Sequence, residues 1–469
     1  MHRENLPRKG EEIELEITTS AFGGKAVGRN EGLVYFVKDA VPGDRIKALV
    51  LRRKKNFVEA RMSQLIEASK DRVEPRCQHF GVCGGCHWQN LSYPRQLEEK
   101  QLHVQDLFKK IAGINMKIPS TIPSKSKYCY RNKMEFSFGV NRWLSHEEID
   151  SGLPLSKGFA LGLHKPGRYD KLVDIKECFL PDQNTIKILN RVREISLNQG
   201  WNPYNSRTHK GFLRNLVFRS SESSGHVLLG LITTRSDKER MKLLGSRLQT
   251  EFKQITSLVN AVNQTRSPVA AGEETIIFGS GEITEMIGNL SFQIPLTGFF
   301  QPNSIQAKKL YQLVLELCEP EGKEFLFDIY CGMGCIGLYM ASNVGRVFGL
   351  ENDARSVVNA RSNALKNRIK NVQFKACDAL EAFSQEVLHE IGNPDIVVLD
   401  PPRAGLHKNV LKKLLQVLPS RIVYVSCNPA TQSRDVASLL SSYNVHTVQP
   451  VDMFPQTPHI ECVVRLDKK

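Results

Sequence analysis

Residues 325–337, FLFDIYCGMGCIG, decide the fold of the last third of this chain. The apolar run FLFDIY predicts a buried strand, and the helix-like segment IGLYMASN follows the turn. Gly332, Gly334 and Gly337 have G-x-G-x-x-G spacing, which lets the backbone turn tightly and approach a ligand. Glu351 ends the next predicted strand, where a carboxylate can accept hydrogen bonds from both hydroxyls of a ribose. The stretch predicts a site for an adenosine cofactor, and it does not separate NAD from S-adenosylmethionine.

Alternating apolar strands and amphipathic helices continue on both sides of this turn, from about residue 296 to the last residue. This alternation predicts an α/β fold with a Rossmann-like doubly wound parallel sheet in a domain spanning 296–469. Asp378 follows the third predicted strand, where an acid often contacts adenine; an ordinary helix cap is the alternative. The predicted strands are FLFDIY, RVFGLE, NVQFKACD, DIVVLD and RIVYVSC, with a last pair near 445–452 and 460–466.

Two motifs follow the fourth and fifth strands: DPPRAG at 400–405 and SCNPATQSRD at 426–435. Doubly wound sheets bind ligands at the carboxyl edge where such strands end. A thiolate is a strong nucleophile, so Cys427 at this edge is a candidate nucleophile. An inert buried thiol is the alternative.

The first region, 1–66, predicts a small OB-like β-barrel because short apolar stretches alternate with Gly-rich turns. Its cations crowd the segment 45–61, with Phe57 among them. Oligonucleotide-binding barrels combine cations and aromatics in this way, although a solvated basic face is the alternative.

The middle region, 67–295, predicts an α+β domain with a cysteine cluster. Cys77, Cys83 and Cys86 are spaced C-x5-C-x2-C, and Cys178 follows much later. Soft ligands of this kind fit either tetrahedral zinc or an iron–sulfur cluster. In the same region 97–114 has the apolar spacing of a helix that crosses between regions. The strand GFLRNLVFRS, with Arg214, Asn215 and Arg219, is either a nucleic-acid contact or a strand with outward charges.

The composition limits the partners. A net charge of +15 favours a polyanion, either nucleic acid or an anionic membrane surface. No apolar run is long enough for a spanning helix, and the amino terminus lacks the apolar core of a signal peptide, so we expect a cytoplasmic protein. Eleven cysteines in such a protein favour metal binding and catalysis over disulfides. The isolated ones are expected to be small buried hydrophobes, namely Cys129, Cys318, Cys331, Cys377 and Cys462.

DPPRAG, SCNPATQSRD, the upstream GFFQPNS with Gln301 and the terminal HIECVV together resemble the RNA uracil-5 methyltransferase family. The resemblance covers nearly the whole chain. The amino-terminal unit looks like a TRAM domain, and FGVCGGCHWQ and KECFLPD resemble the iron–sulfur members. It implies a 4Fe-4S cluster on Cys77, Cys83, Cys86 and Cys178.

The same resemblance implies a mechanism. Cys427 adds to carbon 6 of uracil, which makes carbon 5 nucleophilic toward the methyl group of S-adenosylmethionine, and Glu461 then removes the carbon 5 proton. Asp400 matches the carboxylate between cofactor and target base. Gln301, Tyr330 and Glu351 match cofactor contacts, and Cys335 departs from the Asn or Thr expected at its position.

The expected partner is RNA, presented as a loop or a flipped nucleotide to a monomeric enzyme. Relatives with both a TRAM-like unit and the cluster favour 23S ribosomal RNA, and the T-loop of tRNA is the alternative. Two alternative functions are an NAD-type dehydrogenase and a non-catalytic RNA-binding protein. Neither of them requires a nucleophile at Cys427.

Overall fold

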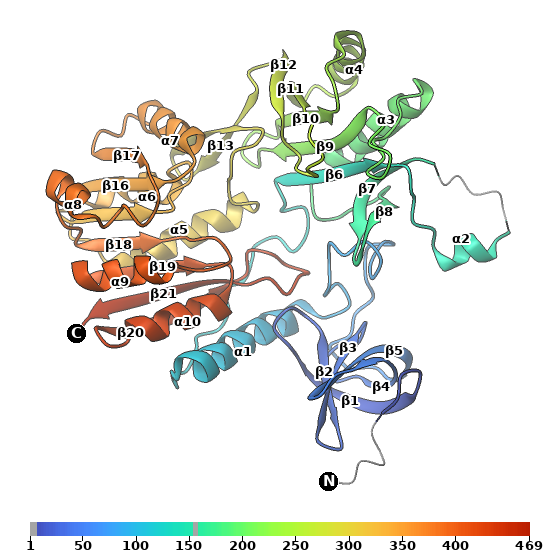
Figure 1. The fold of residues 1–469 in the computed structure, drawn as a ribbon, viewed down its shortest axis with the longest axis horizontal. Coiled ribbons are helices and arrows are strands. Elements are labelled where there is room, and N and C mark those ends of the chain that lie inside the picture. The colour runs from blue at the N-terminus through green and yellow to red at the C-terminus, as the bar shows by residue number, and fades with distance from the viewer. Residues whose placement is uncertain (1–6, 153–157) are drawn as a thin grey trace.

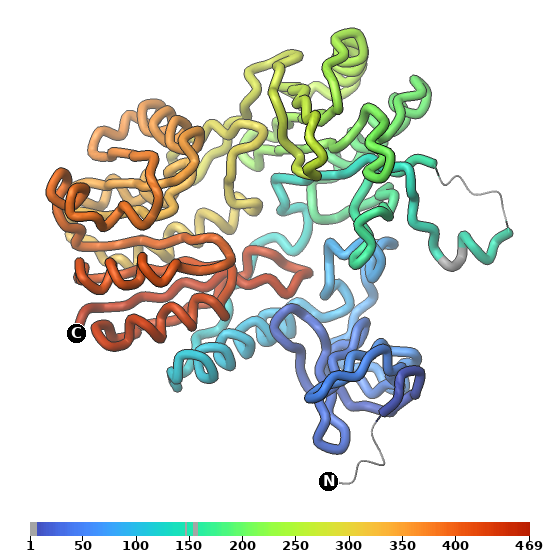
Figure 2. Tube along the Cα trace, viewed as in Figure 1, coloured from blue at the N-terminus to red at the C-terminus, as the bar shows by residue number. Residues whose placement is uncertain are grey.

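The computed structural model describes residues 7–152 and 158–469, which form a closed barrel, two seven-stranded sheets and a two-stranded hairpin (Figure 1). Residues 1–6, at the start of the region expected to be the first domain, and 153–157 lie outside the described residues. Helix α1 (Tyr93–Ala112) runs from the barrel along the C-terminal sheet, and the other sheet lies on the far side of the molecule (Figures 1 and 2). Within the described ranges, no helix has the length and apolar character needed to span a bilayer.

The barrel confirms the predicted small β unit. Its strand order is β1-β2-β3-β5-β4, with Leu15, Ile46 and Val58 among the alternating side chains that fill the interior. One strand, β2, lies inside the glycine-rich segment AFGGKAVGRNEG (21–32), whose composition predicts a turn. The strands are β1 (Glu12–Ser20), β2 (Ala26–Asn30), β3 (Leu33–Lys38), β4 (Arg45–Arg53) and β5 (Phe57–Glu67).

The middle of the chain forms a mixed sheet of order β12-β11-β10-β9-β6-β7-β8, followed by the hairpin β13-β14. Helices α3 and α4 begin at side-chain caps, where Asp182 and Asp237 accept hydrogen bonds from backbone amides of the first turn. The strands are β6 (Lys133–Gly139), β7 (Ala160–Lys165), β8 (Arg168–Asp174), β9 (Leu213–Ser220), β10 (Val227–Thr233), β11 (Ile255–Val262), β12 (Glu273–Phe278), β13 (Glu282–Ile287) and β14 (Leu290–Pro295). The helices are α2 (His146–Asp150), α3 (Gln183–Asn198) and α4 (Lys238–Glu251).

The C-terminal sheet confirms the predicted doubly wound fold. Its order is β17-β16-β15-β18-β19-β21-β20, parallel as far as β19 and antiparallel beyond it. The strand order reverses between β15 and β18, so this edge is the switch point where such sheets bind ligands. The strands are β15 (Phe325–Ile329), β16 (Arg346–Glu351), β17 (Val372–Ala376), β18 (Ile396–Leu399), β19 (Arg421–Ser426), β20 (Tyr443–Val451) and β21 (Glu461–Lys468). The helices are α5 (Ser304–Cys318), α6 (Cys335–Met340), α7 (Ala354–Lys366), α8 (Gln385–Ile391), α9 (Lys408–Val417) and α10 (Pro429–Leu439).

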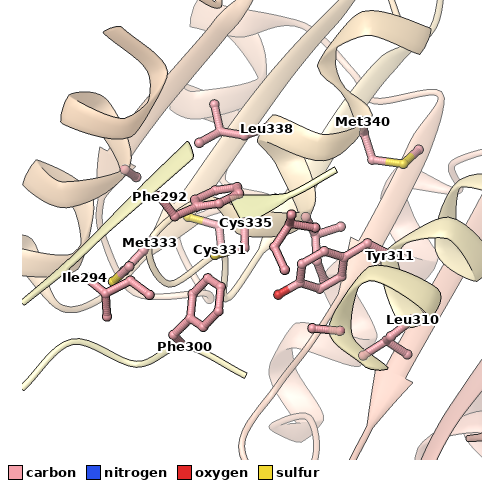
Figure 3. Close-up of a cluster of buried hydrophobic side chains, with 14 of the residues drawn as sticks. Phe292, Ile294, Phe300, Leu310, Tyr311, Cys331, Met333, Cys335, Leu338 and Met340 are labelled. Carbon is pink, nitrogen blue, oxygen red and sulfur yellow. The ribbon is translucent and has the colours of Figure 1, made fainter. Parts of the chain in front are cut away.

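Apolar cores cover both faces of this sheet, which is why its central strands are apolar throughout. On one face Phe292, Phe300 and Tyr311 pack with the sulfur-containing side chains Cys331 and Cys335 (Figure 3). On the other face the core includes Val104 and Phe108 of α1, which packs against α10. The predicted crossing helix therefore packs against the C-terminal unit and also joins it to the barrel, since Glu99 of α1 accepts a hydrogen bond of 2.6 Å from the Ser20 hydroxyl of β1.

Strand β9 does not present its arginines to solvent, so the reading of GFLRNLVFRS as a strand with outward charges is wrong for Arg214 and Arg219, while a contact with nucleic acid stays a prediction. Arg214 and Arg219 are 5% and 2% exposed. Arg219 donates to the carbonyl oxygens of Leu296 and Gly298, while Arg214 donates to carbonyls of the loop after β11. A guanidinium group can be buried when its N–H groups donate to backbone carbonyls. Here these hydrogen bonds connect β9 to the loop after β11 and to the segment after β14.

The isolated cysteines divide into two groups. Cys318, Cys331 and Cys462 are buried, as predicted. The prediction is wrong for Cys129, which is exposed in a loop, and for Cys377, which is half-buried after the edge strand β17.

Candidate active site

A cavity of about 640 Å3 opens at the carboxyl edge of the C-terminal sheet, beside the switch point. We call it the switch-point cavity. Its volume suits a ligand of cofactor size. Its lining includes the predicted residues Gln301, Tyr330, Gly332, Glu351, Asp400, Cys427 and Glu461, which come from distant parts of the chain.

The glycine turn forms one wall of this cavity. Gly332 has φ +53°, and its amide donates to Glu351 Oε2 at 3.1 Å, so turn and carboxylate are joined before any ligand binds. Gly334, at φ +76°, lies behind the lining: a Cβ there would come within 2.7 Å of the Phe374 ring. The glycines thus shape the backbone, as predicted, but Gly334 acts through packing.

Cys335, which departs from the family pattern, is buried at the start of α6, in the same apolar cluster as Tyr311. Both side chains line the switch-point cavity and lie in the cluster drawn in Figure 3. Burial is the main cause that raises the pKa of Cys335 to about 12, so this thiol is neutral at physiological pH.

Asp378 lies in a smaller adjoining cavity of about 200 Å3, which shares Tyr330, Glu351 and Asn352 with the switch-point cavity. Asp378 is exposed, and its Oδ1 accepts a hydrogen bond of 2.8 Å from the amide of Leu380. The side chain thus makes a contact within a turn and does not cap a helix, since Ser384 caps α8, and it faces the space beside the predicted ribose site.

Cys427 directly follows β19 and precedes α10. The antiparallel ladder between β19 and β21 ends with the pair Ser426–Cys462, so Cys427 and Glu461 are the next residues to oppose each other. The Arg403 guanidinium lies close enough to lower the pKa of the Cys427 thiol against the effect of burial. Cys427 and Glu461, which are more than thirty residues apart in the sequence, therefore lie opposite each other at one end of the sheet.

The loop that carries Arg403 is tied to the loop that carries Cys427. Asn428 caps α10 and donates from Nδ2 to the Arg403 carbonyl at 2.9 Å. Asp435, fully buried on α10, accepts hydrogen bonds from the Leu406 amide and the Tyr424 hydroxyl, both at 2.8 Å. These contacts hold DPPRAG and SCNPATQSRD as one rigid unit.

The switch-point cavity is acidic. Burial raises the pKa of Asp328 and of Asp400 to about 7, and burial with the nearby Asp400 holds the pKa of Glu461 well above its usual range. Burial, followed by the charge of Glu461, raises the pKa of the Cys427 thiol to about 11. Such a cavity disfavours an anionic diphosphate and fits a cationic ligand such as a sulfonium.

Several lining residues were missed by the sequence analysis, above all Asp328. Its Oδ2 accepts a 2.8 Å hydrogen bond from Gly337, and its buried Oδ1 has no partner among the described residues. The signal was present: one acid stands inside the otherwise apolar strand FLFDIY. The other missed residues that line the cavity include Arg403, Phe454 and His459.

The cysteine cluster lies outside this cavity. Cys77, Cys86 and Cys178 are buried, and Cys83 is half-buried. The four thiols lie near one another, because a negative charge on Cys77, Cys83 or Cys86 would raise the pKa of Cys178. Burial is the main cause that raises the pKa of Cys86 and Cys178 to about 12. Within residues 7–152 and 158–469, no group of three metal-binding side chains is arranged for a single ion.

Comparisons with known proteins identify the chain. Residues 8–62 match the family model of the TRAM domain, and residues 276–469 match the model described as tRNA (uracil-5-)-methyltransferase. An uncharacterized RNA methyltransferase of Chlorobaculum tepidum is 39% identical over 98% of this chain and 97% of its own length. The chain belongs to the RNA uracil-5 methyltransferase family. Another such relative, from Bacteroides thetaiotaomicron, is 38% identical over 95% of this chain and 99% of its own.

The family also has a similar solved structure, the tRNA (uracil-54, C5)-methyltransferase of Pyrococcus abyssi in complex with S-adenosyl-L-homocysteine. It is 28% identical, covers 96% of this chain and 100% of its own, and superposes with a TM-score of 0.74. The acidic cavity of this RNA uracil-5 methyltransferase suits a cationic cofactor. The dehydrogenase and the non-catalytic RNA-binding protein are excluded as readings of the chain.

Proposed function

We propose that this enzyme forms 5-methyluridine in RNA through a covalent bond between Cys427 and the target uracil. The observation that carries the proposal is the opposition of Cys427 and Glu461 at the end of the β19–β21 ladder, both lining the switch-point cavity. A nucleophile and a base that face one cavity can act on adjacent carbons of one ring.

The reaction begins at the thiol. Cys427 gives its proton to water, and its sulfur bonds to carbon 6, which moves the ring electrons onto carbon 5 and the carbon 4 oxygen. S-adenosylmethionine supplies an electrophilic methyl group. The Glu461 carboxylate then takes the carbon 5 proton, the carbon 5–carbon 6 double bond re-forms, and the sulfur leaves as a thiolate. Arg403 supports the anionic sulfur, since its positive charge lowers the pKa of this thiol against the effect of burial.

The lining of the switch-point cavity fits the cofactor for two reasons. Its carboxyl groups can face the positive charges of the cofactor. Asp328 Oδ1, which has no partner among the described residues, can accept a hydrogen bond from it. Asp400 would lie between the cofactor and the target base. The residues that we assign to contact with the cofactor are Gln301, Tyr330, Gly332, Glu351, Asp378 and Asp400, and Gly334 is assigned to the glycine turn that supports them from behind the lining.

The barrel is proposed to bind the RNA backbone. The end of β4 carries Arg52 and Arg53, and the turn before β5 carries Lys54 and Lys55, all of them exposed. Phe57 stands beside them and packs edge-on against Phe36, with ring centroids 5.4 Å apart. Cations at such a turn bind phosphates, and binding weakens as salt rises. We infer that the enzyme acts on this RNA as a monomer in the cytoplasm.

We propose 23S ribosomal RNA as the substrate, because the resemblance to TRAM-bearing iron–sulfur relatives favours it. The T-loop of tRNA is the second candidate. It is favoured by the Pyrococcus abyssi enzyme, which covers nearly all of this chain and acts on tRNA.

Mapping 5-methyluridine in a deletion strain tests both substrates. We expect one uridine of 23S ribosomal RNA to lose its methyl group, and purified enzyme with tritiated S-adenosylmethionine to restore it. Loss in the T-loop alone would reassign the substrate to tRNA. Unchanged 5-methyluridine in both RNA pools, with no tritium transfer to either, would contradict the proposed function.

Cys77, Cys83, Cys86 and Cys178 are proposed to hold a 4Fe-4S cluster. Four neighbouring and largely buried thiols are suitable ligands for iron. In a 4Fe-4S cluster each thiolate binds a different iron, so the four sulfur atoms lie farther apart than they would around a single zinc ion. The cluster would be structural, since these residues do not line the switch-point cavity.

Anaerobic purification is expected to give brown protein with about four irons and four sulfides per chain. Cys178→Ser should lose most of the iron and lower the unfolding temperature, whereas Cys129→Ser, at an exposed cysteine, should keep both. Colourless wild-type protein with one zinc per chain would refute the cluster.

A further inference from the structure

A second cavity, of about 630 Å3, lies in the central sheet where the β7–β8 hairpin faces the start of β9. We call it the hairpin cavity. None of the residues assigned above to cofactor, catalysis or cluster lines it. Its lining includes Lys165, Arg168, Tyr169, Tyr204, Arg214 and Arg266.

One wall of the hairpin cavity is held rigidly by Arg214, the buried arginine of β9. Its guanidinium donates to the carbonyls of Asn263 at 2.8 Å and Thr265 at 2.6 Å, and its Cζ lies 4.5 Å from the centre of the Tyr204 ring. These contacts fix the loop that carries Arg266 and one aromatic ring of the lining. The cavity is therefore formed before a ligand arrives.

The other wall is the β7–β8 hairpin, which is supported by the cysteine loop, residues 77–86. A Cβ on Gly84 would lie 2.3 Å from Pro166 in the hairpin turn, so the loop and the turn are in close contact. Lys165 Nζ reaches the Gly81 carbonyl at 3.5 Å and lies 5.3 Å from the centre of the Trp143 ring. The cysteine loop thus positions this wall.

The side chains left free on these walls are cationic and aromatic. Tyr169 is 77% exposed. Arg168 and Arg266 are exposed, and neither has an ion-pair partner among the residues that the structure describes. The one acid of the lining, Asp170, is already paired with Arg207. Cations beside an exposed aromatic ring are typical of single-stranded nucleic-acid sites.

The hairpin cavity is connected to the switch-point cavity along the surface. A third cavity of about 550 Å3 shares His164 with the hairpin cavity and shares Phe299, Phe300 and Pro302 with the switch-point cavity. Arg131 lines it, and so does Lys133, which is paired with Glu135 at 2.6 Å, so cations lie between the hairpin cavity and the acidic switch-point cavity. One strand of RNA could therefore contact all three cavities.

We propose that the hairpin cavity binds an unpaired nucleotide of the substrate RNA while the target uridine occupies the switch-point cavity. The base stacks on Tyr169, and Arg168 and Arg266 bind the flanking phosphates. The site rests on the proposed function, since it deepens how that enzyme holds its RNA.

Equilibrium binding of a short single-stranded RNA and of the methylated RNA tests this site. Tyr169→Ala should raise the Kd about tenfold, and Tyr169→Phe, which keeps the ring, should restore it. The double variant Arg168→Ala/Arg266→Ala should lower the slope of log Kd against log salt by about 1.4, because two phosphates would no longer be neutralised. Unfolding temperature and S-adenosylmethionine affinity should match wild type.

The matched control is Lys187→Ala/Lys242→Ala, which removes two exposed cations of α3 and α4 outside the cavity. This variant should leave the salt slope near the wild-type value. Wild-type affinity in Tyr169→Ala, or an equal change of slope in the control, would overturn the site. RNA binding is measured apart from methyl transfer, so a wild-type enzyme that binds RNA without methylating it counts against the proposed function alone.

Discussion

Replacing Cys427 with alanine should abolish methyl transfer to RNA, by about four orders of magnitude or more. Without the sulfur, carbon 5 of uracil has no added electron density and is a poor nucleophile toward a methyl group. Cofactor affinity should stay within a few-fold of wild type, because none of the residues assigned to the cofactor comes from the loop after β19 that carries Cys427. Tritium transfer and calorimetry measure the two properties.

Cys129→Ala is the matched control for this variant, since it also removes a thiol that is accessible to solvent. It should methylate RNA at the wild-type rate. Turnover of the Cys427 variant within tenfold of wild type would remove the thiol from the mechanism, and a loss of cofactor affinity equal to the loss of rate would reassign it to binding.

Glu461→Gln should stop the reaction one step later. An amide cannot accept the carbon 5 proton, so the double bond cannot re-form and the sulfur cannot leave. Glutamine has nearly the shape of the buried glutamate, and its neutral side chain removes the cost of ionising a carboxyl beside Asp400. The methylated RNA should therefore remain attached to the protein, visible as a slow band on a denaturing gel.

The double variant Cys427→Ala/Glu461→Gln provides the control, because it lacks the atom that forms the bond. It should give no slow band. Release of methylated RNA by Glu461→Gln at the normal rate would assign the base to another group of the switch-point cavity, with Asp400 the first to test.

Much of the fold follows from the sequence because burial leaves a periodic signal. Strand β15 is apolar at four of its five positions and buried at all five, so it could be predicted as a central parallel strand. Strand β2 could not, because a short run bounded by glycines has the composition of a turn. The buried Arg214 and Arg219 mislead for a different reason: their carbonyl partners lie about fifty and eighty residues away in the chain.

The candidate site could be located because parallel strands bring their carboxyl ends to one edge. That rule places Glu351, Asp400 and Cys427 together without any knowledge of side-chain contacts. It does not predict the partners of Cys427: Glu461 opposes it through an antiparallel register, and Arg403 reaches it through a loop tied down by Asn428. Such pairings depend on tertiary geometry that composition and spacing do not carry.

The covalent role of Cys427 is tested most directly with RNA in which the target uridine is replaced by 5-fluorouridine. Fluorine cannot leave carbon 5 as a positive ion, so addition and methylation should proceed and the sulfur should stay bound to carbon 6. Digestion and mass spectrometry should then find one peptide, containing Cys427, that carries the methylated fluorinated nucleotide. An intact enzyme that forms no adduct while methylating ordinary RNA, or an adduct on another residue, would contradict the mechanism.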